Sequence, residues 1–177
     1  MMKRFIAILL CALMLFSGSA LAEIANAVNP LTPCASLKEA ARIAGFGIDA
    51  PEKAEGCTVA IQAWKNNLIE ICYDNGKNTL TVRKARGEAD VSGDFTDYPN
   101  TAVYWLNGVT VTLKGDSSAL RLITWTYQGY SYSLSCSTGM DSARALRAMQ
   151  RLCGVKPSAK DSKSRLFEAL NAWGREK

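Results

Sequence analysis

The sequence predicts an α+β fold, in which an antiparallel meander sheet of about seven strands packs against an N-terminal helix and one or two C-terminal helices. Between Cys57 and Cys136, apolar and polar residues alternate, as they do in strands with one buried face. Turn sequences such as Asn75-Gly76 and Asn107-Gly108 separate the alternating segments, as in hairpins. After residue 141 the apolar residues show a helical spacing, so a helix is expected to cover the apolar face of the sheet.

Residues 1–22 are expected to be a cleavable signal peptide. Lys3 and Arg4 precede an uncharged apolar run, and Ala20 and Ala22 supply the small side chains of a signal peptidase site, so cleavage is expected after Ala22. An uncleaved anchor is the alternative, although the apolar run is short for a bilayer span. The expected location is extracytoplasmic, either secreted or periplasmic, with no transmembrane segment left after signal removal.

The domain is expected to span residues 36–154, after an extended leader over residues 23–35. Ser36 and Glu39 match a capping box, which would begin a short helix, and Gly45 supplies its C-terminal stop. Residues 155–177 are expected to form a linker and a basic amphipathic C-terminal helix.

The strands are expected at residues 57–64, 68–74, 78–84, 101–107, 109–115, 119–127 and 130–136. Two-residue loops at Asn75-Gly76, Asn107-Gly108 and Gln128-Gly129 would pair Ile71 with Leu80, Leu106 with Val109, and Trp125 with Tyr132. Together with a three-residue loop at 65–67, which pairs Ile61 with Ile71, these registers place the apolar residues on one face. Because short hairpins join the strands, a meander is the simplest topology.

The opposite face of the sheet is expected to carry exposed tryptophans. The same registers place Trp64, Leu68 and Trp105 on it, among several threonines. These three residues are the candidate ligand or partner surface, and coverage by the C-terminal helix is the alternative.

Five cysteines follow the expected signal peptide, and all are disulfide candidates: Cys34, Cys57, Cys72, Cys136 and Cys153. Export makes disulfides possible, but an odd number cannot all pair within one chain, and their connectivity stays open. Their spacing contains no C-x-x-C, so neither a zinc ribbon nor a thioredoxin-type redox pair is expected.

The composition excludes several chemistries. The chain has no histidine, which removes Ser-His-Asp and Cys-His hydrolases and histidine-ligated metal centres. No phosphate-binding or dinucleotide-binding glycine motif is present, so no cofactor is expected. Nucleic acid is not an expected partner, because the aromatic residues do not interleave with a basic stripe. No catalytic residue is predicted.

One acidic segment is a weak candidate for calcium. Asp90, Asp94 and Asp97 offer hard oxygen ligands, but their spacing is not that of an EF-hand loop. The alternative is a loop held by Asx-type hydrogen bonds. Paired carboxylates that act as in glycosidases also stay open, because their separations are invisible in a sequence.

Several stretches together resemble the bacterial domain-of-unknown-function family 4367. They lie between residues 36 and 153, and they are Ser36-Leu37-Lys38-Glu39-Ala40-Ala41, Tyr73-Asp74-Asn75-Gly76, Leu80-Thr81-Val82-Arg83-Lys84-Ala85, Asp90-Val91-Ser92-Gly93-Asp94, Val111-Thr112-Leu113-Lys114-Gly115, Thr124-Trp125-Thr126 and Tyr130-Ser131-Tyr132-Ser133. The resemblance implies an exported or membrane-tethered extracytoplasmic domain and no catalytic residues. The chain departs from the family in its cysteines and in the tail after Gly154.

The expected function is that of a non-catalytic domain that binds or senses an unknown protein, cell-wall or lipid ligand at the bacterial cell envelope. A carrier of a lipid or other apolar ligand is one alternative, since a curved sheet and its helices can enclose an apolar slot. A histidine-free hydrolase with paired carboxylates is the other, and it requires two carboxyl groups facing one cleft.

Overall fold

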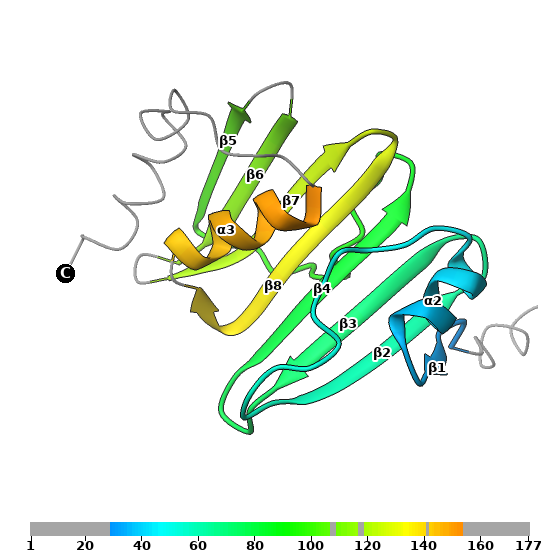
Figure 1. Ribbon diagram of the computed structural model, residues 1–177. Helices are drawn as coiled ribbons and strands as arrows, with labels where there is room; N and C mark the ends of the chain where they lie inside the picture. The colour runs from blue at the N-terminus through cyan, green and yellow to red at the C-terminus, as the bar shows by residue number, and fades with distance from the viewer. Residues whose placement is uncertain (1–28, 107–108, 117–118, 141, 154–177) are drawn as a thin grey trace, which may run out of the picture. The chain divides into compact units, whose positions relative to one another are not determined.

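The fold is an eight-stranded antiparallel sheet with helices on one face, so the predicted α+β class is confirmed. The computed structural model describes residues 29–106, 109–116, 119–140 and 142–153. Its strands are β1 (Thr32–Cys34), β2 (Thr58–Trp64), β3 (Leu68–Asp74), β4 (Thr79–Arg86), β5 (Asn100–Leu106), β6 (Val109–Gly115), β7 (Leu120–Tyr127) and β8 (Tyr130–Met140). Its helices are α2 (Leu37–Ala44) and α3 (Ser142–Cys153) (Figure 1).

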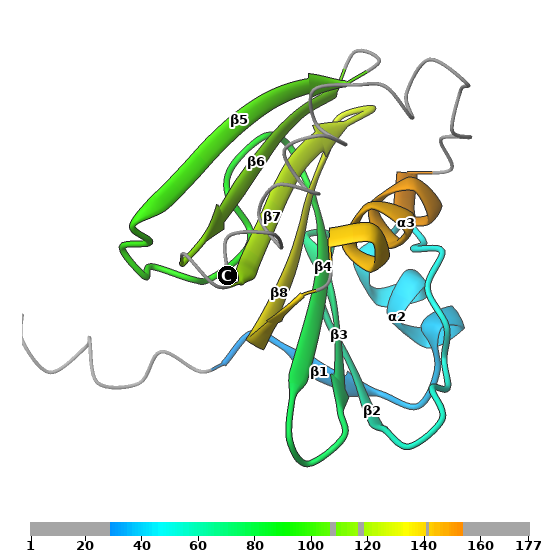
Figure 2. The ribbon, with the colours of Figure 1, turned by 90° about the vertical axis from the view of Figure 1, so that its left-hand side faces the viewer.

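The strand order departs from a simple meander at one point. The order is β1-β2-β3-β4-β8-β7-β6-β5, so β4 pairs with β8 and not with β5. The connection from β4 to β5, residues 87–99, is too long for a hairpin and does not require the two strands to be neighbours. The sheet therefore consists of two hairpin-connected halves, and β5 forms the edge opposite β1 (Figures 1 and 2).

Three of the four predicted registers are confirmed. Ile61 pairs with Ile71, Leu106 with Val109, and Trp125 with Tyr132. The register at Asn75-Gly76 is wrong, because Ile71 pairs with Val82 and not with Leu80. The Asn75 side chain accepts hydrogen bonds from the amides of Lys77 and Asn78, which makes a four-residue loop. A shift of two residues leaves every side chain on its predicted face.

The predicted N-cap Ser36 of α2 is confirmed, whereas the return bond of Glu39 goes to the Ala35 amide and not to the Ser36 amide. The Ser36 hydroxyl accepts from the Glu39 amide at 3.2 Å, and the Glu39 carboxylate accepts from the Ala35 amide at 2.8 Å. Gly45 ends the helix in the left-handed conformation with φ 75°, which glycine adopts without steric cost. The helix packs on β2 and β3 through Ala40 and Ala44, both fully buried.

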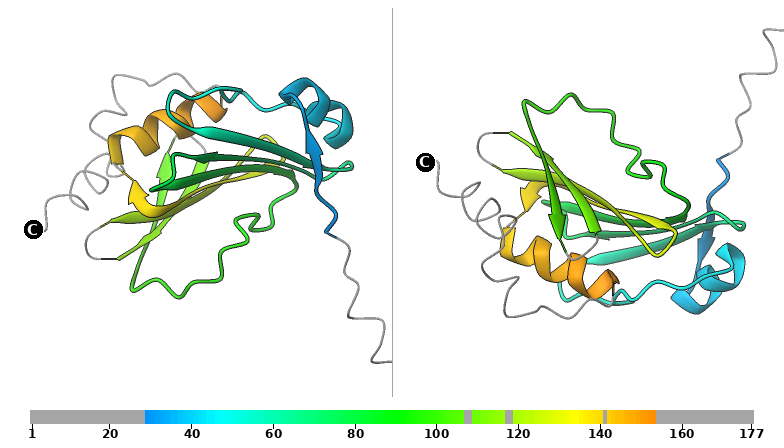
Figure 3. Two further views of the ribbon diagram at one scale, coloured as in Figure 1. Left: turned by 90° about the horizontal axis from the view of Figure 1, so that it is seen from below. Right: turned by 90° about the horizontal axis from the view of Figure 1, so that it is seen from above.

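Both helices cover the same face of the sheet, which we call the helix-covered face (Figure 3). The predicted role of the segment after residue 141 is confirmed, since α3 packs on β7 and β8 through Met149 and Leu152. The Gly45–Cys57 connection crosses this face as well, between α2 and β2. The core therefore lies between the sheet, the two helices and this connection.

The 87–99 connection crosses the other face, which we call the hydroxyl face because serines and threonines line it (Figure 3). The Arg83 guanidinium donates to Glu70 at 2.6 Å and to the backbone carbonyls of Val91 and Ser92. Gly93 has φ 61°, and a side chain there would collide with that guanidinium. The connection is therefore held by a charged group that projects from the sheet.

The end of the predicted leader belongs to the sheet. Thr32–Cys34 pair with β2 as the edge strand β1. The predicted signal peptide (1–22) and C-terminal helix (155–177) lie outside the described residues.

Candidate functional site

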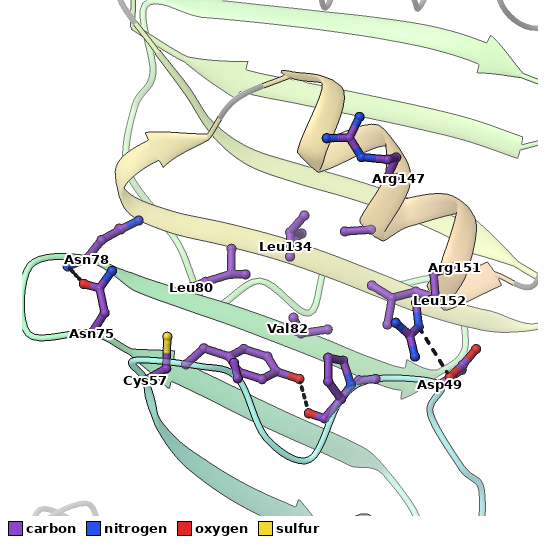
Figure 4. A pocket seen from close by; sticks show the side chains of 15 residues that line it. Asp49, Cys57, Asn75, Asn78, Leu80, Val82, Leu134, Arg147, Arg151 and Leu152 are labelled. Atoms are coloured by element: carbon purple, nitrogen blue, oxygen red, sulfur yellow. Dashed lines mark hydrogen bonds and ion pairs between the residues drawn. The ribbon is translucent and has the colours of Figure 1, made fainter.

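A cavity of about 490 Å³ opens on the helix-covered face, between α3, the Gly45–Cys57 connection and strands β3, β4 and β8 (Figure 4). We call it the α3 cavity. Most of its lining is apolar, and the lining residues are Asp49, Ala50, Pro51, Ala54, Cys57, Tyr73, Asn75, Asn78, Leu80, Val82, Leu134, Arg147, Ala148, Arg151 and Leu152. Its volume lies in the range of about 300–1,000 Å³ that is typical of small-molecule pockets.

The floor and one wall of the cavity come from different parts of the chain. Leu80, Val82 and Leu134 project from β4 and β8 because they alternate with polar residues that face the other way. The wall is the Gly45–Cys57 connection, and the Tyr73 hydroxyl holds it by donating to the Pro51 carbonyl at 2.7 Å. Burial raises the pKa of Tyr73 to about 12, so the phenol stays a neutral donor.

Lys84 binds the same connection near its start, at Gly47. The Lys84 ammonium donates to the Gly47 carbonyl at 2.7 Å and lies 4.3 Å from the centre of the Tyr130 ring and 5.4 Å from that of Phe46. Burial lowers the pKa of Lys84. Cation–π contacts with these rings offset part of the desolvation. The wall of the cavity is therefore fixed to the sheet at two places.

The rim of the cavity is charged. Arg147 and Arg151, one helical turn apart on α3, are exposed and line it. The Arg151 guanidinium lies 3.7 Å from the Asp49 carboxylate of the opposite wall. Figure 4 shows both arginines extending from α3, while Asn75 and Asn78 lie at the other end of the cavity. The site thus combines an apolar interior with a polar, cationic edge.

A second hollow, of about 440 Å³, lies on the hydroxyl face and is polar. Its lining includes two carboxylates, Asp94 and Asp116. Asp116 accepts from Arg121 at 2.9 Å and from the Ala119 amide, and Asp94 accepts from Tyr98 at 2.7 Å and from the Thr96 amide. Burial raises the pKa of Asp94, but the hydrogen bonds outweigh it, so the net shift is downward. These hydrogen bonds favour the ionised form of Asp94, and Asp116 is paired with the Arg121 guanidinium.

The three residues of the predicted ligand surface lie on two parts of the sheet that are far apart. Trp64 and Leu68 pair with each other at the ends of β2 and β3, and Trp64 is 42% exposed. Trp105 belongs to β5, six positions from β2 in the strand order, and its side chain is outside what the structure describes. At about 4.8 Å per strand this separation exceeds ~20 Å. The role of these residues as a ligand or partner surface stays a prediction.

The weak calcium prediction is not supported. Within the described ranges, no three acidic, histidine or cysteine side chains are grouped so that they could hold a metal ion. Asp90 accepts from the Ser92 amide at 2.8 Å and Asp94 from the Thr96 amide at 3.0 Å. Asp97 is exposed. The alternative, a loop held by Asx-type hydrogen bonds, is confirmed.

The five predicted disulfide candidates are free thiols in the structure: Cys34, Cys57, Cys72, Cys136 and Cys153. No paired position in the sheet joins two of them, so strand pairing does not give the Cα separation of about 4.4–6.8 Å that a disulfide needs. Cys153 accepts from the Trp125 indole at 2.7 Å. Burial raises the pKa of Cys153 to about 11. Cys153 is therefore a small packing group beneath α3, and the connectivity of the five cysteines stays open.

Comparison with known proteins adds no relative: no family model, curated protein or solved structure matches the chain. The resemblance to family 4367 accordingly stays a prediction.

The sequence did not predict the α3 cavity, because the residues that line it come from four separate segments. The one local signal was the Arg147 and Arg151 pair beside the apolar residues of the helix that follows residue 141.

Proposed function

We propose that the protein is a non-catalytic binding or sensing domain of the bacterial cell envelope, and that it binds a small apolar or amphipathic ligand in the α3 cavity. The observation that carries this proposal is the cavity itself, which has an apolar floor and a charged rim. A concave apolar site with a few polar groups is the usual form of a small-molecule pocket.

The location at the envelope rests on the predicted signal peptide, residues 1–22. No helix in the described part of the chain is long and apolar enough to cross a membrane. A binding domain and a carrier both require the same cavity, and they differ in whether the ligand is later passed to another protein. The cavity therefore supports the predicted binding role and its carrier alternative together.

The hydrolase alternative has less support. Two carboxylates do face the polar hollow on the hydroxyl face, but glycoside hydrolysis needs one of them protonated near neutral pH. Asp94 has a lowered pKa, so it favours the ionised form, and Asp116 is paired with Arg121. Glu88 and Asp90 also line one smaller hollow, and both side chains are exposed.

The test is titration with N-phenyl-1-naphthylamine, a neutral apolar fluorophore that brightens in apolar surroundings. Ala148 is half-buried on α3 and lines the cavity, so Ala148→Trp is expected to occupy it and weaken binding by about tenfold or more. Ala60→Trp is the matched control. Ala60 is exposed on β2 and pairs with Cys72 of β3, so it lies on the hydroxyl face, away from the cavity.

Loss of fluorescence in Ala148→Trp with unchanged fluorescence in Ala60→Trp would support the proposal. Equal binding by both variants would place the probe elsewhere and contradict it. Absence of binding by the unmodified protein would contradict it as well. Circular dichroism of each variant confirms that the comparison is made between folded proteins.

A further inference from the structure

The rim of the α3 cavity carries more positive than negative charge. Arg147 and Arg151 line it from α3, and Asp49 is the one carboxylate among its described lining residues. At neutral pH these three groups leave a net charge of about one positive unit at the rim. The two arginines are four residues apart on one helix, which puts their Cβ atoms about 5–6 Å apart and lets both guanidinium groups reach one small anion.

Asp49 compensates only part of this charge. The Asp49–Arg151 separation is 3.7 Å, and the two side chains are 69% and 60% exposed. Exposed pairs of this kind are weak, because water and salt screen them, so another anion can replace the carboxylate. Arg147 has no ion-pair partner among the described residues. Both guanidinium groups can therefore donate to a ligand.

The other end of the cavity is neutral. The Asn78 side-chain amide donates to the Cys136 sulfur and accepts from the Ser137 hydroxyl and the Thr138 backbone amide. The Asn75 side-chain oxygen accepts from the backbone of its own turn. The cavity thus changes along its length from a cationic rim at α3 to a neutral end at the β3–β4 turn (Figure 4). The apolar side chains of Leu80, Val82 and Leu134 lie along it.

Lys84 does not add to the rim charge. Its ammonium group is committed to the Gly47 carbonyl and to the Tyr130 ring, and Lys84 does not line the cavity. The charge that a ligand meets is therefore that of α3 and Asp49 alone. The anion-binding groups are therefore Arg147 and Arg151. Both are exposed on α3, so each can be substituted without disturbing the core.

On the premise of the proposed function, we infer that the ligand is an anionic amphiphile. Its apolar chain lies over Leu80, Val82 and Leu134, and its carboxylate or phosphate group is bound by Arg147 and Arg151. The planar guanidinium group donates two parallel hydrogen bonds to such oxyanions, whereas a neutral head group would leave the rim charge uncompensated. The apolar interior supplies affinity and the arginines supply selectivity for the head group.

The experiment compares decanoate with decanol, which have the same chain length and differ in head-group charge. Each is titrated against protein loaded with N-phenyl-1-naphthylamine, at low ionic strength and neutral pH. We expect decanoate to bind about tenfold more tightly than decanol, and the ratio to fall as salt screens the exposed rim. Decyl phosphate, run in parallel, distinguishes a phosphorylated head group from a carboxylate.

Two variants assign the selectivity to the rim. Arg147→Gln with Arg151→Gln is expected to bring decanoate down to the affinity of decanol and to leave decanol unchanged. Asp49→Asn is expected to raise decanoate affinity by about twofold to threefold, because it releases Arg151. Arg42→Gln is the matched control, since Arg42 is exposed on α2 and does not line the cavity.

The outcomes separate this inference from the proposed function. Equal displacement by decanoate and decanol in the unmodified protein would overturn the anionic ligand and leave the apolar site intact. A decanoate preference that survives the double arginine variant would also overturn it. Failure of the naphthylamine probe to bind at all would overturn the proposed function, and this inference with it.

Discussion

The two faces of the sheet are stabilised in different ways. The helix-covered face buries Ile71, Leu134 and Trp125 under α2, α3 and the Gly45–Cys57 connection. The hydroxyl face carries serines and threonines, and the 87–99 connection is held there by Arg83 and Glu70. Apolar burial is non-directional, whereas a charged pair fixes one geometry. The difference places the candidate ligand site on the helix-covered face.

The largest expected effect compares two consecutive residues of β8 that face opposite ways. Leu134 is 1% exposed on the helix-covered face, so Leu134→Ala is expected to lower the free energy of unfolding by about 2–5 kcal/mol. Ser135 faces the hydroxyl side, and Ser135→Ala is expected to change it by less than about 0.5 kcal/mol. Urea unfolding measures both. Equal losses would mean that the two faces contribute alike.

A smaller loss is expected when the charged pair of the hydroxyl face is broken. Glu70→Gln leaves the Arg83 guanidinium without its ion pair, and the side chains are only 23% and 11% exposed. We expect a loss of about 2–3 kcal/mol in unfolding free energy, below the full cost of a completely buried charge. Asp49→Asn, at an exposed pair, should cost under about 0.5 kcal/mol in the same urea experiment. Similar values for the two variants would contradict this account.

The thiol of Cys153 provides a kinetic measure of burial on the helix-covered face. Because burial raises its pKa to about 11, only about one thiol in a thousand is ionised at pH 8. Iodoacetamide alkylation, followed by peptide mass spectrometry, should accelerate about tenfold per pH unit between pH 8 and 10. A rate that levels off near pH 9, the ordinary pKa of a thiol, would show that α3 does not bury this group.

The smallest effect is expected at the tryptophan that the sequence singled out. Trp64 lies on the hydroxyl face next to Leu68, away from the α3 cavity. Trp64→Ala should therefore change the naphthylamine dissociation constant by less than about twofold. A tenfold loss of binding in a folded variant would move the ligand site back to the surface first predicted.

Local signals predicted the fold well because hairpins are local structures. The turns at residues 65–67 and Gln128-Gly129 fixed their registers, and Ser36 and Gly45 marked the ends of α2. The predicted register at Asn75-Gly76 was wrong because hydrogen bonds to the Asn75 side chain make a loop of four residues and not two. The Asn-Gly pair alone does not specify this length. The length of the 87–99 connection was the available sign that β4 and β5 need not pair.

The site was much harder to predict, because its residues are far apart in the sequence. Its floor, wall and rim come from β4, β8, the Gly45–Cys57 connection and α3, which only the tertiary fold brings together. The registers placed Trp64, Leu68 and Trp105 on one face, but they do not show how far apart the strands lie in the sheet. Arg147 and Arg151 were visible as helix surface residues, but the sequence does not show that a cavity lies beside them.

The most direct test of the central claim is a titration of the methyl-labelled protein with decanoate, observed by carbon–proton NMR. The account predicts that the resonances of Leu80, Val82, Leu134 and Leu152, which line the α3 cavity, shift together and saturate with one dissociation constant. The methyl groups of Thr79 and Thr81, which line the polar hollow of the hydroxyl face, should not move. Shifts confined to those threonines, or no shifts at all, would contradict a ligand site on the helix-covered face.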